Sequence, residues 1–295
     1  MPAAGIAAQR DGAAGAAIYA WCFARDMTRT MSPSLPLQSV RSLSDPREAS
    51  IPFATSWAVE LEPGETPHIV GIGSLLDDST APGAGCRLHV WYGGPADEDI
   101  ASLMPYLPLL EQEEVGRLRI PSHRWSVAAA RAAARTQLAQ LLDCAPAEVG
   151  IVRDPLGKPK LDPAAHGRLA ERIHFNISHT TGLVAVAVAT RRIGIDVEAV
   201  RSLDDLDGIA AETFAPPMLE ALKAARQPSE KIALFYRFWT LGEAFIKATG
   251  QGLAQDLRTF AFSQAGPPRL THLYGVGNAA EHWAFATIDA TSLPA

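Results

Sequence analysis

The chain has 295 residues, of which 47% are hydrophobic and 20% charged, a balance typical of a soluble globular protein with one large domain or two small ones. Its net charge of −6, without any dense basic run, argues against nucleic acid as a partner. No apolar run approaches the length of about 18 residues that a membrane span needs, so no membrane association is expected. The three cysteines lie far apart and form no C-x-x-C pair, which argues against a zinc site or a disulfide framework and favours the cytoplasm.

Residues 1–85 are predicted to be an N-terminal extension to which no function is assigned. The first dozen residues are rich in Ala and Gly, and residues 30–52 are rich in Ser and Pro, which is typical of partly disordered sequence. Two short strands fit the pattern at residues 58–61 and 68–72.

From residue 86 the pattern is clearer. Alternating apolar and polar residues predict a strand over 87–91, and helical stretches are expected over 100–119 with breaks at Pro105 and Pro108. An Ala-rich helix follows, from about Ser122 to about Cys144, because Ala is the strongest helix former.

Arg131 and Arg135 are four residues apart, so they share one face of this helix. The face is either simply solvated or a clamp for phosphate oxygens, which guanidinium groups suit well. After a strand predicted at 149–153, the turn that starts at Asp154 displays Lys158, which is again either solvated or a ligand contact.

The segment from residue 173 to 198 is the densest in possible functional residues. LVAVAVAT (183–190) and IGIDVE (193–198) are interpreted as two strands of a hairpin. Asp196 and Glu198 are two residues apart on a strand, so they share a face, while the intervening apolar residues point to a core. The two carboxylates are either the polar outward face of an edge strand or hard oxygen ligands that suit Mg²⁺.

Ser178 and His179 lie where the preceding strand gives way to a turn of small residues. His179 is either structural or, together with Ser178 and nearby backbone donors, part of a site that meets a phosphate.

Helices are expected over 203–209 and 212–225, with an interruption at Pro216-Pro217, and strands over 258–263, 269–273 and 282–289. Between them, a helix from about Lys231 carries the stretch FYRFWTLGEAFIKATGQGL, which ends at two glycines. Its broad apolar face consists of Phe235, Phe238, Trp239, Phe245 and Ile246.

Glu243 and Lys247 lie one turn apart beside this apolar face. A carboxylate and an amine in this arrangement are either a surface ion pair or catalytic groups.

Three stretches, FNISHTTG, IGIDVE and FWTLGEAFIKATGQGL, together resemble the 4′-phosphopantetheinyl transferases in their order and separation. The length of the chain resembles the large, Sfp-type branch, and the likeness covers residues 86–295. It implies an α+β fold of two similar α/β halves, related by a pseudo-twofold axis, with coenzyme A between them. We place the halves at residues 86–200 and 201–295.

The resemblance implies a monomeric enzyme that transfers the phosphopantetheine arm of coenzyme A to a serine of an acyl or peptidyl carrier protein. The other product would be adenosine 3′,5′-bisphosphate, and polyketide, nonribosomal peptide and fatty-acid carriers all remain open. The matched positions imply that Mg²⁺, with Mn²⁺ as an alternative, is held by Asp196, Glu198 and Glu243.

Asp196, Glu243 and Lys247 would be the catalytic residues, with Lys247 as base, proton donor or charge stabiliser. The positions implied for the nucleotide and its phosphates are Arg131, Arg135, Lys158, Ser178, His179 and Lys247.

The chain departs from this family at three positions. Gly242 stands where Lys commonly precedes the metal-binding Glu, Met218 stands where Glu is frequent, and His123 stands where an acidic residue is usual. These departures leave open a relative that binds coenzyme A or a carrier protein without catalysis, and an unrelated Mg²⁺-dependent phosphohydrolase is a third alternative. Residues 213–222, around Pro216-Pro217, are our expected carrier contact.

Overall fold

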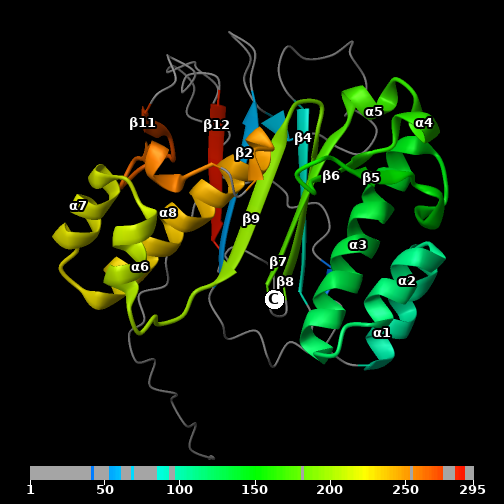
Figure 1. Ribbon diagram of the computed structural model, residues 1–295, viewed down its shortest axis with the longest axis horizontal. Helices are drawn as coiled ribbons and strands as arrows, with labels where there is room; N and C mark the ends of the chain where they lie inside the picture. Colours follow the sequence, from blue (N-terminus) through cyan, green and yellow to red (C-terminus); the bar gives the residue numbers. More distant parts are fainter. Residues whose placement is uncertain are drawn as a thin grey trace, which may run out of the picture.

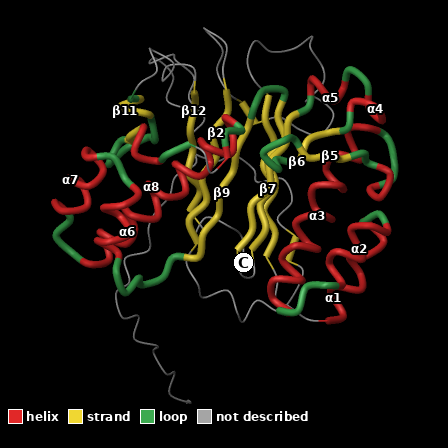
Figure 2. The backbone as a smooth tube through the Cα atoms, in the orientation of Figure 1, coloured by secondary structure: helices red, strands yellow, loops and turns green. Residues whose placement is uncertain are grey.

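The computed structural model describes residues 41–42, 53–60, 68–69, 85–92, 97–180, 183–252, 255–274 and 283–289. The Ala/Gly-rich start and most of the predicted loop at 30–52 lie outside these ranges. Strands occupy the middle of the molecule and helices flank them on two sides, α1 to α5 on one side and α6 to α8 on the other (Figures 1 and 2). The arrangement is the α+β fold that the sequence predicts, but β2 (Phe53–Glu60) and β9 (Ile193–Ala199) belong to the sheet of the second half, outside the predicted range 201–295. None of the helices in the described ranges is both long enough and apolar enough to cross a membrane.

The first half is built on the antiparallel strands β4 (Gly85–Tyr92), β8 (Leu183–Ala189) and β7 (His174–Thr180), with β8 in the centre. The short strands β1 (Arg41–Ser42) and β3 (His68–Ile69) pair in parallel with β4. Every residue of β8 is buried, as expected of a strand with neighbours on both edges and a helix on its face.

Helix α3 (Pro121–Leu142) covers this sheet. Its many buried alanines let the helix axis lie close to the strands, and Trp125 and Leu138 fill the larger spaces against Phe175 and Val186. Smaller elements surround α3: α1 (Asp97–Leu103), the 3-10 helix η3 (Met104–Tyr106), α2 (Leu109–Gly116), η4 (Pro146–Glu148), β5 (Ile151–Arg153), β6 (Pro159–Leu161), α4 (Pro163–His166) and α5 (Leu169–Arg172).

The second half is built on the antiparallel sheet β12–β2–β9, formed by Trp283–Asp289, Phe53–Glu60 and Ile193–Ala199. Helix α8 (Pro228–Thr249) packs on β9 and β2. The remaining elements are α6 (Leu206–Thr213), α7 (Pro216–Ala224), η6 (Leu257–Thr259), β10 (Phe260–Phe262) and β11 (Leu270–Leu273).

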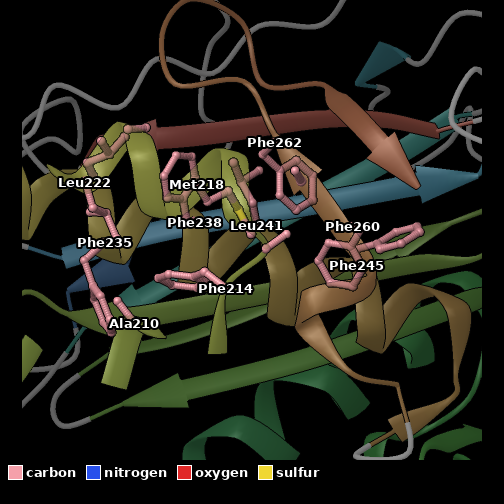
Figure 3. Packing of buried hydrophobic residues seen from close by; sticks show 14 of the residues in the cluster. Ala210, Phe214, Met218, Leu222, Phe235, Phe238, Leu241, Phe245, Phe260 and Phe262 are labelled. Carbon is pink, nitrogen blue, oxygen red and sulfur yellow. The ribbon is translucent and has the colours of Figure 1, made fainter. Parts of the chain in front are cut away.

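The predicted apolar face of α8 is confirmed as the centre of this half. Phe235, Phe238, Phe245 and Ile246 are buried, and Trp239 stacks on Phe235 with ring centroids 6.0 Å apart. Figure 3 shows these phenylalanines packed with side chains from α7 and β10. Met218 is one of them and is fully buried in this cluster. An apolar residue at this position therefore serves the core, and a carboxylate there would lose its water.

The predicted hairpin of residues 183–190 and 193–198 is wrong. β8 forms its hairpin with β7, and β4 occupies its other edge, so no edge of β8 is left for β9. β9 pairs instead with β2, which comes from the segment predicted to be an N-terminal extension. The chain thus leaves one sheet after β8 and enters the other at β9.

The two sheets meet where β7 and β9 run side by side, and side chains of β7 bridge them. The backbone amide of Ile195 donates to Asn176 Oδ1 at 2.8 Å, and the amide of Val197 donates to Ser178 Oγ at 3.2 Å. Because these amides would otherwise be buried without partners, the two side chains replace the ladder that is missing here.

Candidate active site

The site lies where β7 and β9 run side by side and the two sheets meet, a junction called the seam below. It is built around the carboxylate of Asp196 on β9. Asp196 is only 3% exposed, so both faces of β9 are buried, and the alternative of a polar outward face does not apply to this residue. Its Oδ1 accepts a hydrogen bond from Ser178 Oγ at 3.0 Å and forms an ion pair with Lys247 Nζ at 2.6 Å. Its Oδ2 is buried and has no partner among the described residues.

Lys247 closes a triangle with these two groups, since its Nζ also donates to Ser178 Oγ at 3.1 Å. The side chains come from three elements, β7, β9 and α8, and from both halves. Within the described ranges Lys247 pairs with Asp196, not with Glu243 one turn earlier on its own helix. The surface ion pair that the helix alone suggests is therefore not formed.

Glu198 and Glu243 lie within electrostatic reach of the same carboxylate. Burial raises the pKa of Glu243, and the negative charge of Asp196 raises it further, while Lys247 opposes part of the effect. Burial and Asp196 raise the pKa of Glu198 in the same way, against opposing effects of Lys247 and of a hydrogen bond with Trp239. Burial is the larger cause in both cases and the like charge of Asp196 adds to it, so full ionisation of these three carboxyl groups beside Lys247 would leave an excess of negative charge.

This excess fits a bound cation. A divalent ion would neutralise it, the unpartnered Asp196 Oδ2 is a free hard ligand, and oxygen donors of this kind suit Mg²⁺. Among the described residues, however, no group of three His, Cys, Asp or Glu side chains is already arranged to hold a metal. The predicted ligand set therefore stays a prediction.

A groove of about 260 Å³ opens beside Lys247. Its lining combines the turn between β5 and β6, strand β7 and the C-terminal end of α8. Glu243 and Lys247 are on one wall, and Lys158 and Asn176 also line it. Of these side chains, Lys247 is the cation that suits a phosphorylated ligand.

Lys158 does not point freely into this groove. Its Nζ donates to the carbonyl oxygen of Lys247 and to that of Ile193, the latter at 3.3 Å. Burial lowers the pKa of Lys158 to about 8, with Asp154 opposing the shift and Arg192 adding to it.

His179 lies at the end of β7, exposed, with its ring centroid 6.4 Å from that of His123. Although His179 is exposed at the surface, neighbouring protein atoms displace part of the water around its ring, which lowers its pKa, and the positive charges of His123 and Lys247 lower it further. His123, one of the three positions at which the chain departs from the family pattern, therefore faces the predicted nucleotide contact from the first turn of α3.

The two arginines of α3 lie elsewhere. Arg135 is buried and forms a bidentate pair with Glu111, at 2.7 and 3.0 Å, and it also donates to the carbonyl oxygens of Pro146 and Val149. Arg131 pairs with Glu114 at 2.7 Å. Both guanidinium groups hold α2 on α3, and neither lines the groove. Their phosphate contacts therefore stay a prediction, and this arrangement does not favour it.

Gly242 is explained by packing. A Cβ there would lie 2.7 Å from Leu257 Cδ2 and 3.5 Å from a ring carbon of Phe260. The position faces the core of the second half, so a lysine there would have to displace Leu257 before its ammonium could reach solvent.

Two residues that contribute to the site were not predicted as site residues from the sequence, although Trp239 was placed on the apolar face of its helix. Asn176 accepts from β9 and lines the groove, and Trp239 forms the hydrogen bond with Glu198. The alternation in FNISH carried a signal for Asn176, because it places this residue on the same face as Ser178.

Comparison with known proteins agrees with this geometry. A model of the 4′-phosphopantetheinyl transferase superfamily matches residues 192–292, and a model of the N-terminal part of 4′-phosphopantetheinyl transferases matches residues 91–191. The two matches meet at the start of β9, where the chain passes from one sheet to the other.

Individual relatives give the same result. The chain is 35% identical over 174 residues to the 4′-phosphopantetheinyl transferase HetI of Nostoc sp., which covers 57% of this chain and 71% of HetI. It is 34% identical over 127 residues to a 4′-phosphopantetheinyl transferase of Bacillus subtilis, which covers 43% of this chain and 53% of that protein. With Sfp of Bacillus subtilis it shares 36% identity over 88 residues, 30% of this chain and 38% of Sfp.

The matched regions contain the whole Asp196–Ser178–Lys247 triangle and both nearby glutamates. The chain therefore belongs to the 4′-phosphopantetheinyl transferase superfamily, a superfamily of transferases.

Proposed function

We propose that this protein transfers the 4′-phosphopantetheine arm of coenzyme A to a serine hydroxyl of an acyl or peptidyl carrier protein. The observation that carries the proposal is the ion pair of Asp196 and Lys247, formed across the seam between the two halves. In the reaction the serine Oγ forms a bond to the phosphorus that bears the pantetheine. The diphosphate P–O bond breaks, and adenosine 3′,5′-bisphosphate leaves. We further propose that the protein acts as a cytoplasmic monomer.

Asp196, Glu198 and Glu243 would hold a Mg²⁺ ion, or Mn²⁺ in its place. Bound there, the ion would supply positive charge to the diphosphate oxygens. The orientation of Asp196 supports this assignment, since Ser178 and Lys247 fix its Oδ1 and leave the buried Oδ2 without a partner.

Lys247 suits the leaving phosphate. Its ammonium, held by Asp196 and Ser178 at the edge of the groove, can donate to a phosphate oxygen whose charge grows as the bond breaks. Glu243 lines the same groove, where its carboxylate can accept a proton. We assign the serine proton to Glu243 and the nucleotide phosphates to Lys247, Ser178 and His179.

The test is a transfer assay with purified protein, Mg²⁺, coenzyme A and a panel of apo carrier proteins from polyketide, nonribosomal peptide and fatty-acid synthesis. Mass spectrometry of the carriers should show the gain of one phosphopantetheine arm on at least one of them. A panel without any mass gain would overturn the proposal.

A second candidate function is binding of coenzyme A without transfer. The observation that favours it is again the ion pair, because Lys247 already neutralises the carboxylate that a metal would otherwise neutralise. Calorimetry that shows coenzyme A binding, together with no transfer to any carrier, would favour this alternative.

A further inference from the structure

The turn between β5 and β6 reaches from the first half to the C-terminal end of α8. Lys158 Nζ bonds there to the carbonyl oxygen of Lys247 and, at 3.3 Å, to that of Ile193 on β9. One ammonium group thus joins the helix that carries Glu243 and Lys247 to the strand that carries Asp196.

The turn is shaped to present this ammonium. Asp154 Oδ1 accepts from the amides of Leu156 and Lys158, both at 2.9 Å, and the amide of Gly157 donates to the carbonyl of Asp154 at 2.9 Å. Gly157 has φ of +89°, a conformation that side-chain-bearing residues rarely adopt. These hydrogen bonds and the conformation of Gly157 therefore fix the backbone from which the Lys158 side chain extends.

The end of α8 is a suitable partner. Lys247 contributes one of the last four carbonyl groups of the helix, which have no intrahelical donor. The C-terminal end of a helix also carries partial negative charge, which an ammonium group stabilises. The glycines that follow, Gly250 and Gly252, lie against Lys158 and Leu156 of the turn.

We infer that Lys158 is a positioning residue, which seats the last turn of α8 on β9 and so keeps the ammonium of Lys247 on Asp196. This differs from the nucleotide contact that the family resemblance implies for Lys158. Its effect on the transfer reaction rests on the proposed function, whereas its effect on α8 does not.

The structural test is amide hydrogen exchange of the full chain without ligands. In Lys158→Met the Gly250 amide, which donates to Ile246 O at 3.0 Å, should exchange at least about fivefold faster, because a charge-assisted contact at the helix end is lost. Lys160→Met removes an exposed lysine of β6, the strand that follows the turn, and should leave this exchange unchanged.

Lys158→Arg, which keeps the charge and the donors, should restore most of the protection. If Lys158→Met does not fold, Asp154→Ala should loosen the turn and speed exchange of the same amide. Unchanged exchange of Gly250 in the Lys158 variant, or in the Asp154 variant if it alone folds, would overturn the inference.

The kinetic test separates positioning from contact with the nucleotide. Lys158→Met should lower kcat about tenfold and leave KM for coenzyme A within about threefold, because the contact of Lys247 with the leaving phosphate strengthens as the bond breaks and its displacement costs mainly rate. In a Lys247→Met background the same substitution should lower kcat less than about twofold further, since the two residues act as a unit.

A raised KM for coenzyme A with unchanged kcat would instead identify Lys158 as a nucleotide contact and overturn its positioning role. An inactive wild-type protein would refute the proposed function alone, and the exchange measurement would still decide the role of Lys158.

Discussion

Replacing Gly194 by Ala should damage both stability and activity, because β9 passes directly beneath α8 at this residue. A Cβ at Gly194 would overlap the carbonyl oxygen of Ala244 and the amide nitrogen of Ala248, and it would lie 3.0 Å from Ala248 Cα. All three atoms belong to the helix backbone, so no side-chain rotation can relieve the overlap.

The required displacement can be bounded from these contacts. Ordinary Cβ contacts begin at 3.4 Å, so even the most distant of the three atoms must retreat, and the two nearer atoms must retreat further. Overpacking of this kind costs about 1–3 kcal/mol in the free energy of unfolding. A shift of about 1 Å in α8 would also move Glu243 and Lys247, and misplacement on that scale lowers rates about a hundredfold.

Urea unfolding and the carrier-transfer assay measure the two effects, and Gly242→Ala is the matched control on α8. Its Cβ would crowd the end of one side chain, Leu257 Cδ2 at 2.7 Å, and make an ordinary contact with Phe260 at 3.5 Å, and Ala in place of a helical Gly gains about 1 kcal/mol. Its free energy of unfolding should therefore stay within about 1 kcal/mol of the wild type. Gly194→Ala with wild-type stability and wild-type turnover would refute the close approach of β9 and α8.

Three further predictions concern the site and its support. Asp196→Ala and Glu243→Ala should each lower turnover at least about a hundredfold, on the scale of losing one strong electrostatic element, and near-normal rates would refute the metal assignment. The raised pKa of Glu243 means that the folded protein holds its proton more tightly than the unfolded chain, so stability should fall as pH rises from the ordinary glutamate pKa of about 4.3 through the raised value. Urea unfolding across this range should show a shallower fall for Glu243→Gln, and parallel curves would contradict the shift. Arg135→Met should lower the free energy of unfolding by about 3–5 kcal/mol, because it leaves Glu111 unpaired. Arg135→Lys should not restore the bidentate pair. A raised KM for coenzyme A in a variant of unchanged stability would instead support the predicted phosphate contact.

Local periodicity predicted the elements of this fold well, because it depends on neighbours in sequence. The 3.6-residue pattern placed Phe235, Phe238 and Phe245 on the buried face of α8, and the two-residue pattern placed Ile193, Ile195 and Val197 in the core. These predictions needed no knowledge of which element covers which.

Pairing between distant segments could not be predicted in this way. The short link at Arg191-Arg192 is compatible with a hairpin, but β8 already has β4 and β7 on its edges. The unbroken apolar run of β8 was a sign of such a central strand. β2 comes from a segment of uninformative composition, and its place between β9 and β12 depends on partners more than a hundred residues away.

For the site, too, spacing in the sequence predicted local features but not contacts between distant segments. The spacing of Asp196 and Glu198 predicted that they share a face of β9, but it could not show that β7 and α8 cover this face and bury Asp196. The spacing of Glu243 and Lys247 predicted a pair on one helix, but the lysine reaches across to β9 because a buried carboxylate needs a cation more than a half-exposed one does.

The two carboxylate oxygens of Asp196 have different surroundings. Ser178 of the first half and Lys247 of the second half both bond to Oδ1, so the carboxylate can rotate only by losing contacts with both halves. Oδ2 is thereby left buried without a partner, and burial together with the charge of Asp196 raises the pKa values of Glu198 and Glu243. A site that leaves a buried oxygen unpartnered and two carboxyl groups reluctant to ionise is less stable than an apolar one of the same size. Burial therefore disfavours this arrangement unless a positive charge is bound there, and this links the geometry of the seam to the cation and diphosphate chemistry proposed for it.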